Sequence, residues 1–191
     1  MISPIVSLEG YTPVAVAGRY FFFFLSYSFL GWVLEGSYNK YSNGNFRKEG
    51  FLKGPFKPMY GFAPLLLLIG MEIGLPVLLL LLLALIVPSG VEYASGWLLK
   101  SLFHKQWWDY SSMPYQLHGH ICLRFSVYWW GLASACLFGL HPLMELLYRI
   151  SESLWELLFP VALLYFIADV VWTCWTRRLG DKRVGLGEGQ I

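Results

Sequence analysis

Long apolar runs, separated by shorter polar segments rich in Gly and Pro, are the dominant pattern of this chain. A helix needs about 20 mostly apolar residues to cross the hydrocarbon core of a bilayer. The runs that approach or meet this length lie at roughly 14–35, 59–73, 76–102, 120–140 and 154–176. The second run is the shortest, and Gly74-Leu75-Pro76 predicts a tight turn after it. The pattern therefore predicts an all-α, polytopic membrane helix bundle with about five transmembrane helices.

Residues 142–153, between the fourth and fifth runs, are amphipathic at helical spacing. Leu143, Leu146, Leu147 and Ile150 share one face of such a helix, and charged residues occupy the other. We expect a short interfacial helix here, on the outer surface of the membrane. Residues 1–184 are expected to form one transmembrane helical domain, and the Gly-rich residues 185–191 a flexible C-terminal tail.

The basic residues follow a topological pattern. Of the 14 Lys and Arg residues, all except Arg19 and Arg149 lie in or beside the loop after the first run, the loop after the third run, and the C-terminal segment. With five spans, these three segments face the same side of the membrane. Cytoplasmic loops carry an excess of Lys and Arg, so the segments are predicted to be cytoplasmic and the N-terminus outside.

Composition limits the classes of function. Hydrophobic residues make up 57% and charged residues 14% of the 191 residues, and the mean hydropathy is +0.53. A soluble domain of this size could not bury so much apolar surface, so much of it must face lipid. Nucleic acid is not an expected partner, because the basic residues are few and follow the membrane plane.

The chain carries no recognisable catalytic motif and no Walker A motif for ATP binding. Its 3 Cys residues are not closely spaced, so neither a zinc motif nor a disulfide is indicated. No cofactor is expected, and the question of enzymatic activity stays open.

Four ionisable residues fall within the predicted spans: Glu35, Glu92, Arg124 and Asp169. A charge inside a bilayer is costly and normally faces a bundle interior or a wet cavity. Glu92 lies roughly 24 Å along the third span, at about 1.5 Å per residue. The other three lie near the corresponding ends of their own spans, so we expect all four at one depth, toward the cytoplasmic leaflet.

This convergence predicts a polar, substrate-binding pocket open to the cytoplasm, in which Arg124 balances the three carboxylates. Ser89 and Tyr128 lie at helical spacing from Glu92 and Arg124 and complete the predicted binding set. The alternative is a buried salt bridge that only holds the helices together. The sequence does not decide between these two interpretations.

The two basic loops hold candidate docking residues. The first loop is dense in Gly and Pro, which specifies a shaped turn, and the second contains a Trp pair suited to the headgroup level. Each loop is either a docking surface or a basic topology anchor. The candidates are Gly54, Pro55, Tyr60, Trp107, Trp108 and Asp109.

His118 and His120 precede Cys122, and imidazole and thiolate are good transition-metal ligands. Alternate residues diverge on a helix, so we expect no metal site here. The role of the two histidines stays open.

Several short motifs occur in a fixed order between residues 20 and 135. They are Gly31-Trp32-x-x-Glu35, Gly50-Phe51-Leu52-x-Gly54-Pro55-x-x-Pro58-x-Tyr60-Gly61, Glu92-Tyr93, Trp107-Trp108-Asp109-Tyr110-Ser111 and Gly119-x-Ile121-Cys122-Leu123. Together they resemble the ABC transporter permease family of the CmpB type, a family of bacterial integral membrane proteins. The family usually has Asn and Arg where this chain has His118 and His120.

The resemblance implies a multi-pass protein of the bacterial cytoplasmic membrane with a permease-like role. An ATPase would then be a separate subunit, because this chain has no Walker A motif. The residues that carry over as motif matches are Glu35, Gly54, Pro55, Glu92, Trp107, Trp108 and Asp109.

Three functions remain open at this point. The first is a transport component with a polar pocket near the cytoplasmic leaflet. The second is a membrane-embedded enzyme or a lipid-headgroup-binding protein, and the third is a small scaffold or partner-binding subunit. Membrane lipids are partners in each case. Five spans are few for a lone transporter, so the first function predicts a homo-oligomer or a complex.

Overall fold

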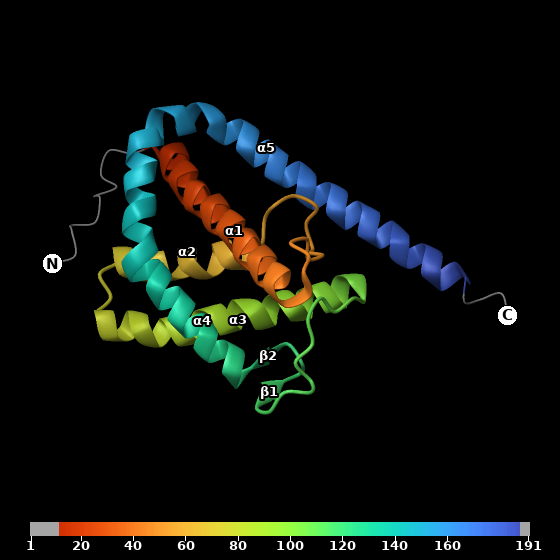
Figure 1. Ribbon diagram of the computed structural model, residues 1–191. Coiled ribbons are helices and arrows are strands. Elements are labelled where there is room, and N and C mark those ends of the chain that lie inside the picture. Colours follow the sequence, from red (N-terminus) through yellow and green to blue (C-terminus); the bar gives the residue numbers. More distant parts are fainter. Residues whose placement is uncertain (1–11, 188–191) are drawn as a thin grey trace.

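The computed structural model describes residues 12–187, with side chains as far as Arg178 (Figure 1). The helices are α1 (Pro13–Asn43), α2 (Pro58–Glu72), α3 (Val77–Phe103), α4 (Leu123–Ala135) and α5 (His141–Gly187), with a π-helical turn η1 (Cys136–Leu140) between the last two. A short antiparallel hairpin pairs β1 (Gln116–Leu117) with β2 (Ile121–Cys122). The all-α prediction is therefore confirmed apart from this hairpin.

Local sequence signals explain where α1 begins and ends. The Thr12 Oγ1 accepts a hydrogen bond from the Ala15 N–H at 3.2 Å, and Pro13 occupies the first turn, where its missing N–H is not needed. Gly44 ends the helix in a left-handed conformation with φ 72°, which glycine adopts without steric cost. Its N–H donates to the Lys40 carbonyl at 2.9 Å.

The predicted turn between α2 and α3 is present. Gly74 adopts φ 78°, and its N–H donates to the Met71 carbonyl at 3.1 Å. The Leu75 N–H donates to the Gly70 carbonyl at 3.1 Å, so carbonyls at the end of α2 are paired as the chain reverses. The two helices consequently run antiparallel and pack against each other.

A compact core lies where α1, α2, α3, α4 and the first turns of α5 meet. The apolar faces of these helices interlock there, and several side chains are fully excluded from the surface. The buried members of the core are Phe23, Tyr27, Leu67, Leu68, Ala84, Ala133, Leu137, Met144 and Tyr148.

The four consecutive phenylalanines of α1 hold this helix against α5. The Phe21 ring lies 5.7 Å from that of Phe159, and the Phe24 ring lies 5.3 Å from that of Phe166 in an edge-to-face pair. Aromatic pairs in this geometry add to the stability gained from apolar burial. The block therefore fixes α5 along the outside of α1 rather than in the centre of the bundle (Figure 1).

The helical stretch reverses its direction within the first turns of α5, beyond η1 (Figure 1): Glu145 and Trp155 both lie beside the start of α1, against Arg19 and Gly18. The π-helical turn η1 and Pro142, which lacks a backbone donor, precede this bend. The segment 142–153, predicted as a separate amphipathic helix, forms the first turns of α5. Its apolar side chains Leu143, Leu146 and Ile150 are exposed, at 50%, 53% and 75%.

Within the described part of the chain, three stretches are long and apolar enough to cross a membrane: α1, α3 and the continuous helical stretch Leu123–Arg178. The helix α2 is apolar but has only 15 residues. Large apolar side chains are exposed along the outer faces, for example Leu82 at 54% and Leu164 at 67%. Such a surface matches lipid better than water, and the chain is a membrane protein.

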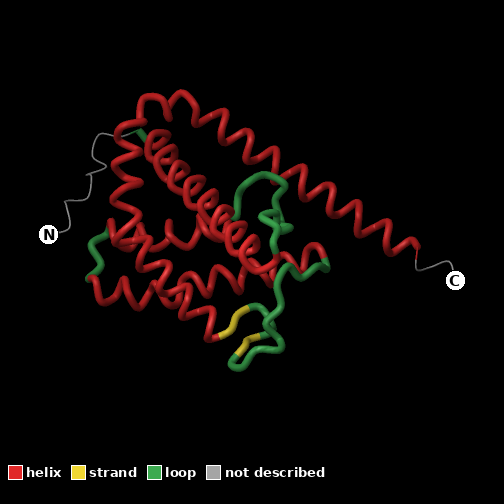
Figure 2. The backbone as a smooth tube through the Cα atoms, viewed as in Figure 1, coloured by secondary structure: helices red, strands yellow, loops and turns green. Residues whose placement is uncertain are grey.

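The two long loops lie at one end of the bundle (Figure 2). Loop one (residues 44–57) and loop three (residues 104–122) meet there, where the Lys105 Nζ lies 2.8 Å from the Glu49 Oε1. We call this the basic end, and the end that carries the Gly74 turn and the bend in the first turns of α5 the opposite end. The helix α5 continues to Gly187, into the segment expected to be a tail, and residues 188–191 lie outside the described residues.

Candidate functional site

Glu92 is the most deeply buried carboxylate among the described residues, with 2% of its surface exposed. It lies on α3, one turn after Pro88, which interrupts the backbone hydrogen bonding of that helix. The Tyr110 hydroxyl donates to the Glu92 Oε1 at 3.0 Å. The Trp129 indole lies nearby, yet no donor within residues 12–178 completes a hydrogen bond to the Oε2 atom. A buried carboxylate oxygen without a partner is unusual, because its desolvation is not compensated.

Glu35 lies near the C-terminal end of α1, and Tyr60 connects it to Glu92. The Lys57 Nζ lies 2.9 Å from the Glu35 Oε2 and the Lys48 Nζ lies 3.5 Å from it. The Tyr60 hydroxyl is close enough to Glu35 and to Glu92 to interact electrostatically with both. We call Glu35, Tyr60, Glu92 and Tyr110 the carboxylate–tyrosine cluster. The structure thus brings together two of the three predicted carboxylates.

Glycine on α1 allows Tyr60 to enter this cluster. A β-carbon on Gly31 would overlap the Tyr60 ring, so only glycine leaves room for it. On its other side the Tyr60 ring packs against Trp129 with centroids 4.9 Å apart. The Lys57 N–H donates to the Ser28 carbonyl at 3.0 Å, which fixes the start of α2 against α1. The motifs that contain Gly31 and Tyr60 therefore meet at one close crossing of α1 and α2.

Asp169 lies apart from the cluster and binds the backbone of loop one. Its Oδ2 accepts from the Gly54 N–H at 3.0 Å, and its Oδ1 accepts from the Lys53 N–H at 3.3 Å. The Thr173 hydroxyl adds a hydrogen bond of 3.3 Å from the next turn of α5. Pro55 is partly buried directly after these amides. Asp169 is a predicted substrate-binding residue and Gly54 a predicted docking residue, and in the structure they are joined by a hydrogen bond.

Arg124 does not balance the carboxylates in the structure. It is exposed, and its Nε donates to the Tyr128 Oη at 3.1 Å on the following turn of α4. Within residues 12–178 no ion pair involves it, and Lys57 takes the expected place beside Glu35. The reason is rotational: Arg124 projects from the outer face of α4, where Tyr128 is also exposed. Ser89 is buried, but its hydroxyl donates to the Leu85 carbonyl of its own helix at 3.0 Å.

At the basic end, Arg177 of α5 binds the backbone of loop one. It donates to the Gly50 carbonyl at 2.7 Å and to the Phe51 carbonyl at 3.1 Å. Its guanidinium lies 5.0 Å from the centre of the Trp107 ring, a cation–π contact. Hydrogen bonds from Lys105 and Arg177 lower the pKa of the Glu49 carboxyl. Loop one, loop three and α5 are therefore joined in one surface.

Loop three is shaped by Trp108 and Asp109. The Trp108 Nε1 donates to the His120 carbonyl at 2.9 Å, and the Asp109 Oδ1 accepts from the Ser111 N–H at 2.9 Å. Hydrogen bonds from the Ser111 hydroxyl and N–H lower the pKa of the Asp109 carboxyl. Gly119 has φ 72° and lies so close to Asp109 that a side chain would not fit. Both predicted docking residues thus hold the fold of the loop itself.

The histidines lie on the hairpin rather than on a helix, because α4 begins only at Leu123. The His118 Nδ1 shares a hydrogen bond of 2.8 Å with the Tyr93 hydroxyl. His120 is 3% exposed, and burial lowers the pKa of its imidazole. Among the described residues no three His, Cys, Asp or Glu side chains are arranged to hold a metal ion.

A family model described as "Putative ABC-transporter type IV" matches residues 22–174. The chain belongs to this family. The predicted resemblance is confirmed, and it extends into α5, beyond the motifs that indicated it. Searches of curated proteins and of solved structures returned no match. Family membership and the apolar helices together make this a membrane protein related to transport.

Residues of the motifs that indicated this family make the contacts described above. Glu35 and Glu92 form the cluster, Gly31 makes room for Tyr60, and the Gly54 amide binds Asp169. Residues separated widely in the sequence are thus joined by a few polar contacts at the basic end.

A second buried charge cluster, at the opposite end, was not predicted. The Arg19 guanidinium is 5% exposed and lies 2.9 Å from the Glu72 Oε1 and 3.0 Å from the Glu145 Oε2. The Tyr20 hydroxyl donates to Glu72, and Arg149 lies 3.1 Å from the Glu145 Oε1. A signal was present in the sequence: Arg19 and Arg149 are the two cations outside the basic segments.

Proposed function

We propose that the chain is a permease-like membrane subunit of an ABC-type transporter, in which the carboxylate–tyrosine cluster contacts the substrate. The observation that carries this proposal is the Glu92 carboxylate, which is buried in a membrane helix with an unpaired oxygen. Ionisable groups at such depth usually serve transport or binding. Membership of the ABC-transporter-type family supports the same role.

The proposed topology has five spans, with the basic end in the bacterial cytoplasm and the N-terminus outside. The basic end carries Lys40, loops one and three, and Arg177, whereas Arg19 and Arg149 at the opposite end are both paired with carboxylates. This distribution follows the positive-inside bias. The short α2 would span only with a local adjustment of the bilayer.

An ATPase on a separate chain is the proposed partner, since this chain lacks a Walker A motif. The surface that joins Glu49, Lys105, Trp107 and Arg177 is the proposed docking region, because it is partly exposed and couples two loops to α5. Gly54 and Pro55 continue this surface toward Asp169. A bundle this small is also expected to assemble with a second copy.

Cysteine accessibility tests the substrate-contact proposal. In a background with Cys122, Cys136 and Cys174 replaced by Ala, Glu92→Cys should react with a membrane-impermeant thiol reagent in inside-out vesicles. Reaction from the other side should be at least several-fold slower. Ala84→Cys, 0% exposed on the same helix, is the protected control. An unreactive position 92 in both orientations would show that the cluster is sealed and structural.

A second candidate is binding of a lipid headgroup by Arg124. This guanidinium is exposed on the first turn of α4, at the basic end, with Tyr128 beside it. A phosphate of an anionic lipid is the natural partner for a cation at that level. Selective loss of bound phosphatidylglycerol in Arg124→Gln, by native mass spectrometry, would favour this candidate.

A further inference from the structure

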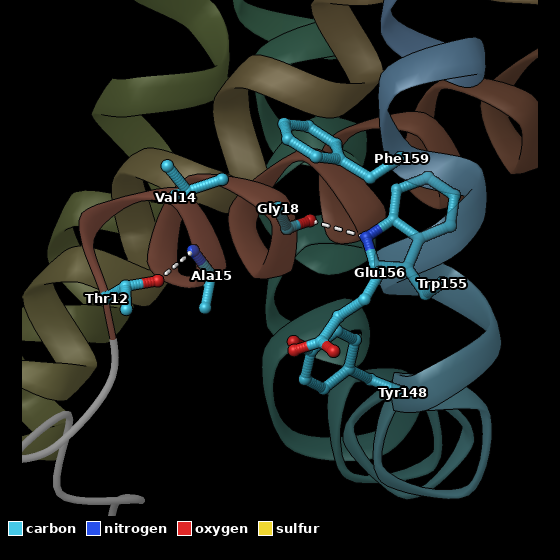
Figure 3. Close-up of a pocket in the computed structure, with 8 residues that line it drawn as sticks. All are labelled: Thr12, Val14, Ala15, Gly18, Tyr148, Trp155, Glu156 and Phe159. Carbon is cyan, nitrogen blue, oxygen red and sulfur yellow. Dashed lines mark hydrogen bonds between the residues drawn. The ribbon is translucent and has the colours of Figure 1, made fainter.

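A cavity of about 230 Å³ lies at the opposite end, between the first turns of α1 and the α5 segment 148–159 (Figure 3). It is distant in sequence and in space from the carboxylate–tyrosine cluster. Thr12, Val14 and Ala15 line it from the side of α1. Because α1 and the apolar part of α5 both begin here, the cavity lies at the level where the membrane-spanning segments meet the interface.

The α5 wall of the cavity combines three aromatic rings with one carboxylate. Tyr148, Trp155 and Phe159 line it, and Glu156 extends from α5 toward the same space (Figure 3). The Trp155 Nε1 donates to the Gly18 carbonyl at 2.7 Å, which fixes the indole as a bridge between the two helices. The ring wall is therefore held in place without a ligand.

Among the described residues at this end, the cations pair with other carboxylates and leave Glu156 without a counter-ion. Within residues 12–178, the acidic side chains near this end are Glu72, Glu145, Glu152 and Glu156, and the cations are Arg19 and Arg149. Both cations pair with Glu72 or Glu145. Within the part of the chain whose side chains are described, Glu156 has no ion pair and no hydrogen bond. The cavity thus presents an uncompensated negative charge beside aromatic faces.

We infer that this cavity binds an alkylammonium group, with Glu156 as its counter-ion and Trp155 and Phe159 as its aromatic walls. Aromatic faces attract cations, and a carboxylate adds charge pairing that a neutral or anionic ligand would not use. Two sources share this chemistry: a free small amine, and the headgroup of an aminophospholipid at the interface. This site is separate from the proposed transport site and does not depend on it.

Purified full-length protein in nanodiscs provides the test. Binding of choline and of ethanolamine is measured by titration calorimetry in phosphatidylglycerol nanodiscs. Retention of phosphatidylethanolamine against phosphatidylglycerol is measured by native mass spectrometry after extraction from mixed nanodiscs. The variants are Glu156→Gln and Phe159→Leu, and the control is Glu152→Gln, one turn earlier on α5 and outside the cavity lining. Thermal unfolding of each variant confirms that it is folded.

The expected result is amine binding, or preferential phosphatidylethanolamine retention, that Glu156→Gln weakens roughly tenfold and Phe159→Leu several-fold. Glu152→Gln should leave it unchanged. Binding in the calorimeter assigns the site to free amines, and selective retention alone assigns it to the lipid. The inference is overturned if no amine binds and phosphatidylglycerol is retained as well as phosphatidylethanolamine. Equal effects of the two Glu→Gln substitutions would also overturn it.

Discussion

The Gly54 backbone N–H donates to the Asp169 Oδ2 at 3.0 Å and thereby ties loop one to the last membrane helix. The Lys53 N–H and the Thr173 hydroxyl bind the other carboxylate oxygen. A carboxylate that accepts several hydrogen bonds holds a loop more firmly than packing alone, because charge strengthens each bond. Asp169 consequently anchors loop one to α5.

Asp169→Ala should release loop one and lower the free energy of unfolding by about 1.5–3 kcal/mol, the range for hydrogen bonds to a charged group. Hydrogen exchange should quicken at the Lys53 and Gly54 amides. Thr173→Val removes only one of the donors to this carboxylate, through a long hydrogen bond of 3.3 Å, and is the matched control. Its expected loss is smaller than that of Asp169→Ala, and slow amide exchange should be retained. Unchanged exchange at Gly54 in Asp169→Ala would contradict the anchor.

Arg19 should be among the most sensitive positions of the chain. Arg19→Met leaves Glu72 and Glu145 buried without their cation, which is expected to destabilise the protein by about 3–5 kcal/mol in thermal or denaturant unfolding. The triple variant Arg19→Met/Glu72→Gln/Glu145→Gln removes the charges together and should recover much of this loss.

Arg149→Gln is the control for this cluster, because the Arg149 side chain is 55% exposed. Its expected effect is below about 1 kcal/mol. If Arg19→Met and Arg149→Gln were equally mild, the buried cluster would not be holding α1, α2 and α5 together.

Gly31→Ala tests the close crossing of α1 and α2. A β-carbon at this position would overlap the Tyr60 ring, so overpacking is expected to destabilise the protein by about 1–3 kcal/mol. Gly90→Ala on α3 is the matched control, since no neighbouring group lies within 4 Å of the place that its β-carbon would occupy. It should be neutral or stabilising by up to about 1 kcal/mol, because alanine favours a helix. Similar unfolding midpoints for the two variants would exclude a tight crossing.

Much of the helix arrangement was predictable because each helix that crosses lipid must be a long apolar run in the sequence. Each of the five apolar runs lies largely in a helical segment, and the Gly74 turn ends α2 as expected. The fifth run does not match its helix in length, because α5 begins at His141 and includes the segment predicted as separate. The membership of the family also followed from short motifs. The count of spans rests on the apolar runs and the orientation on the charge bias, and both are proposals.

Side-chain partners were less predictable, because they depend on helix rotation. Glu35 and Glu92 were expected to approach each other, and they do, but Arg124 points away and Lys57 from loop one replaces it. Lipid is as apolar as the centre of a helix bundle, so the sequence of α4 does not show which of its faces meets the other helices. The hairpin before α4 was missed for a related reason: its strands of two residues are too short to show alternation.

The last prediction concerns pH at the basic end. Lys105 and Arg177 lower the pKa of Glu49 in the folded protein, so its ion pairs stabilise the fold above the unfolded carboxyl pKa of about 4.3. This stabilisation is lost as pH falls through the lower folded pKa. The Glu49 side chain is 63% exposed, so each pair contributes only about 0.2–1 kcal/mol. Glu49→Gln should therefore lower the unfolding midpoint at pH 7, and the difference from the native protein should shrink as the pH approaches 4. Glu152→Gln, for which no ion pair is seen within residues 12–178, should show no such convergence. A Glu49→Gln effect of constant size from pH 7 to pH 4 would assign the stabilisation to packing rather than to charge.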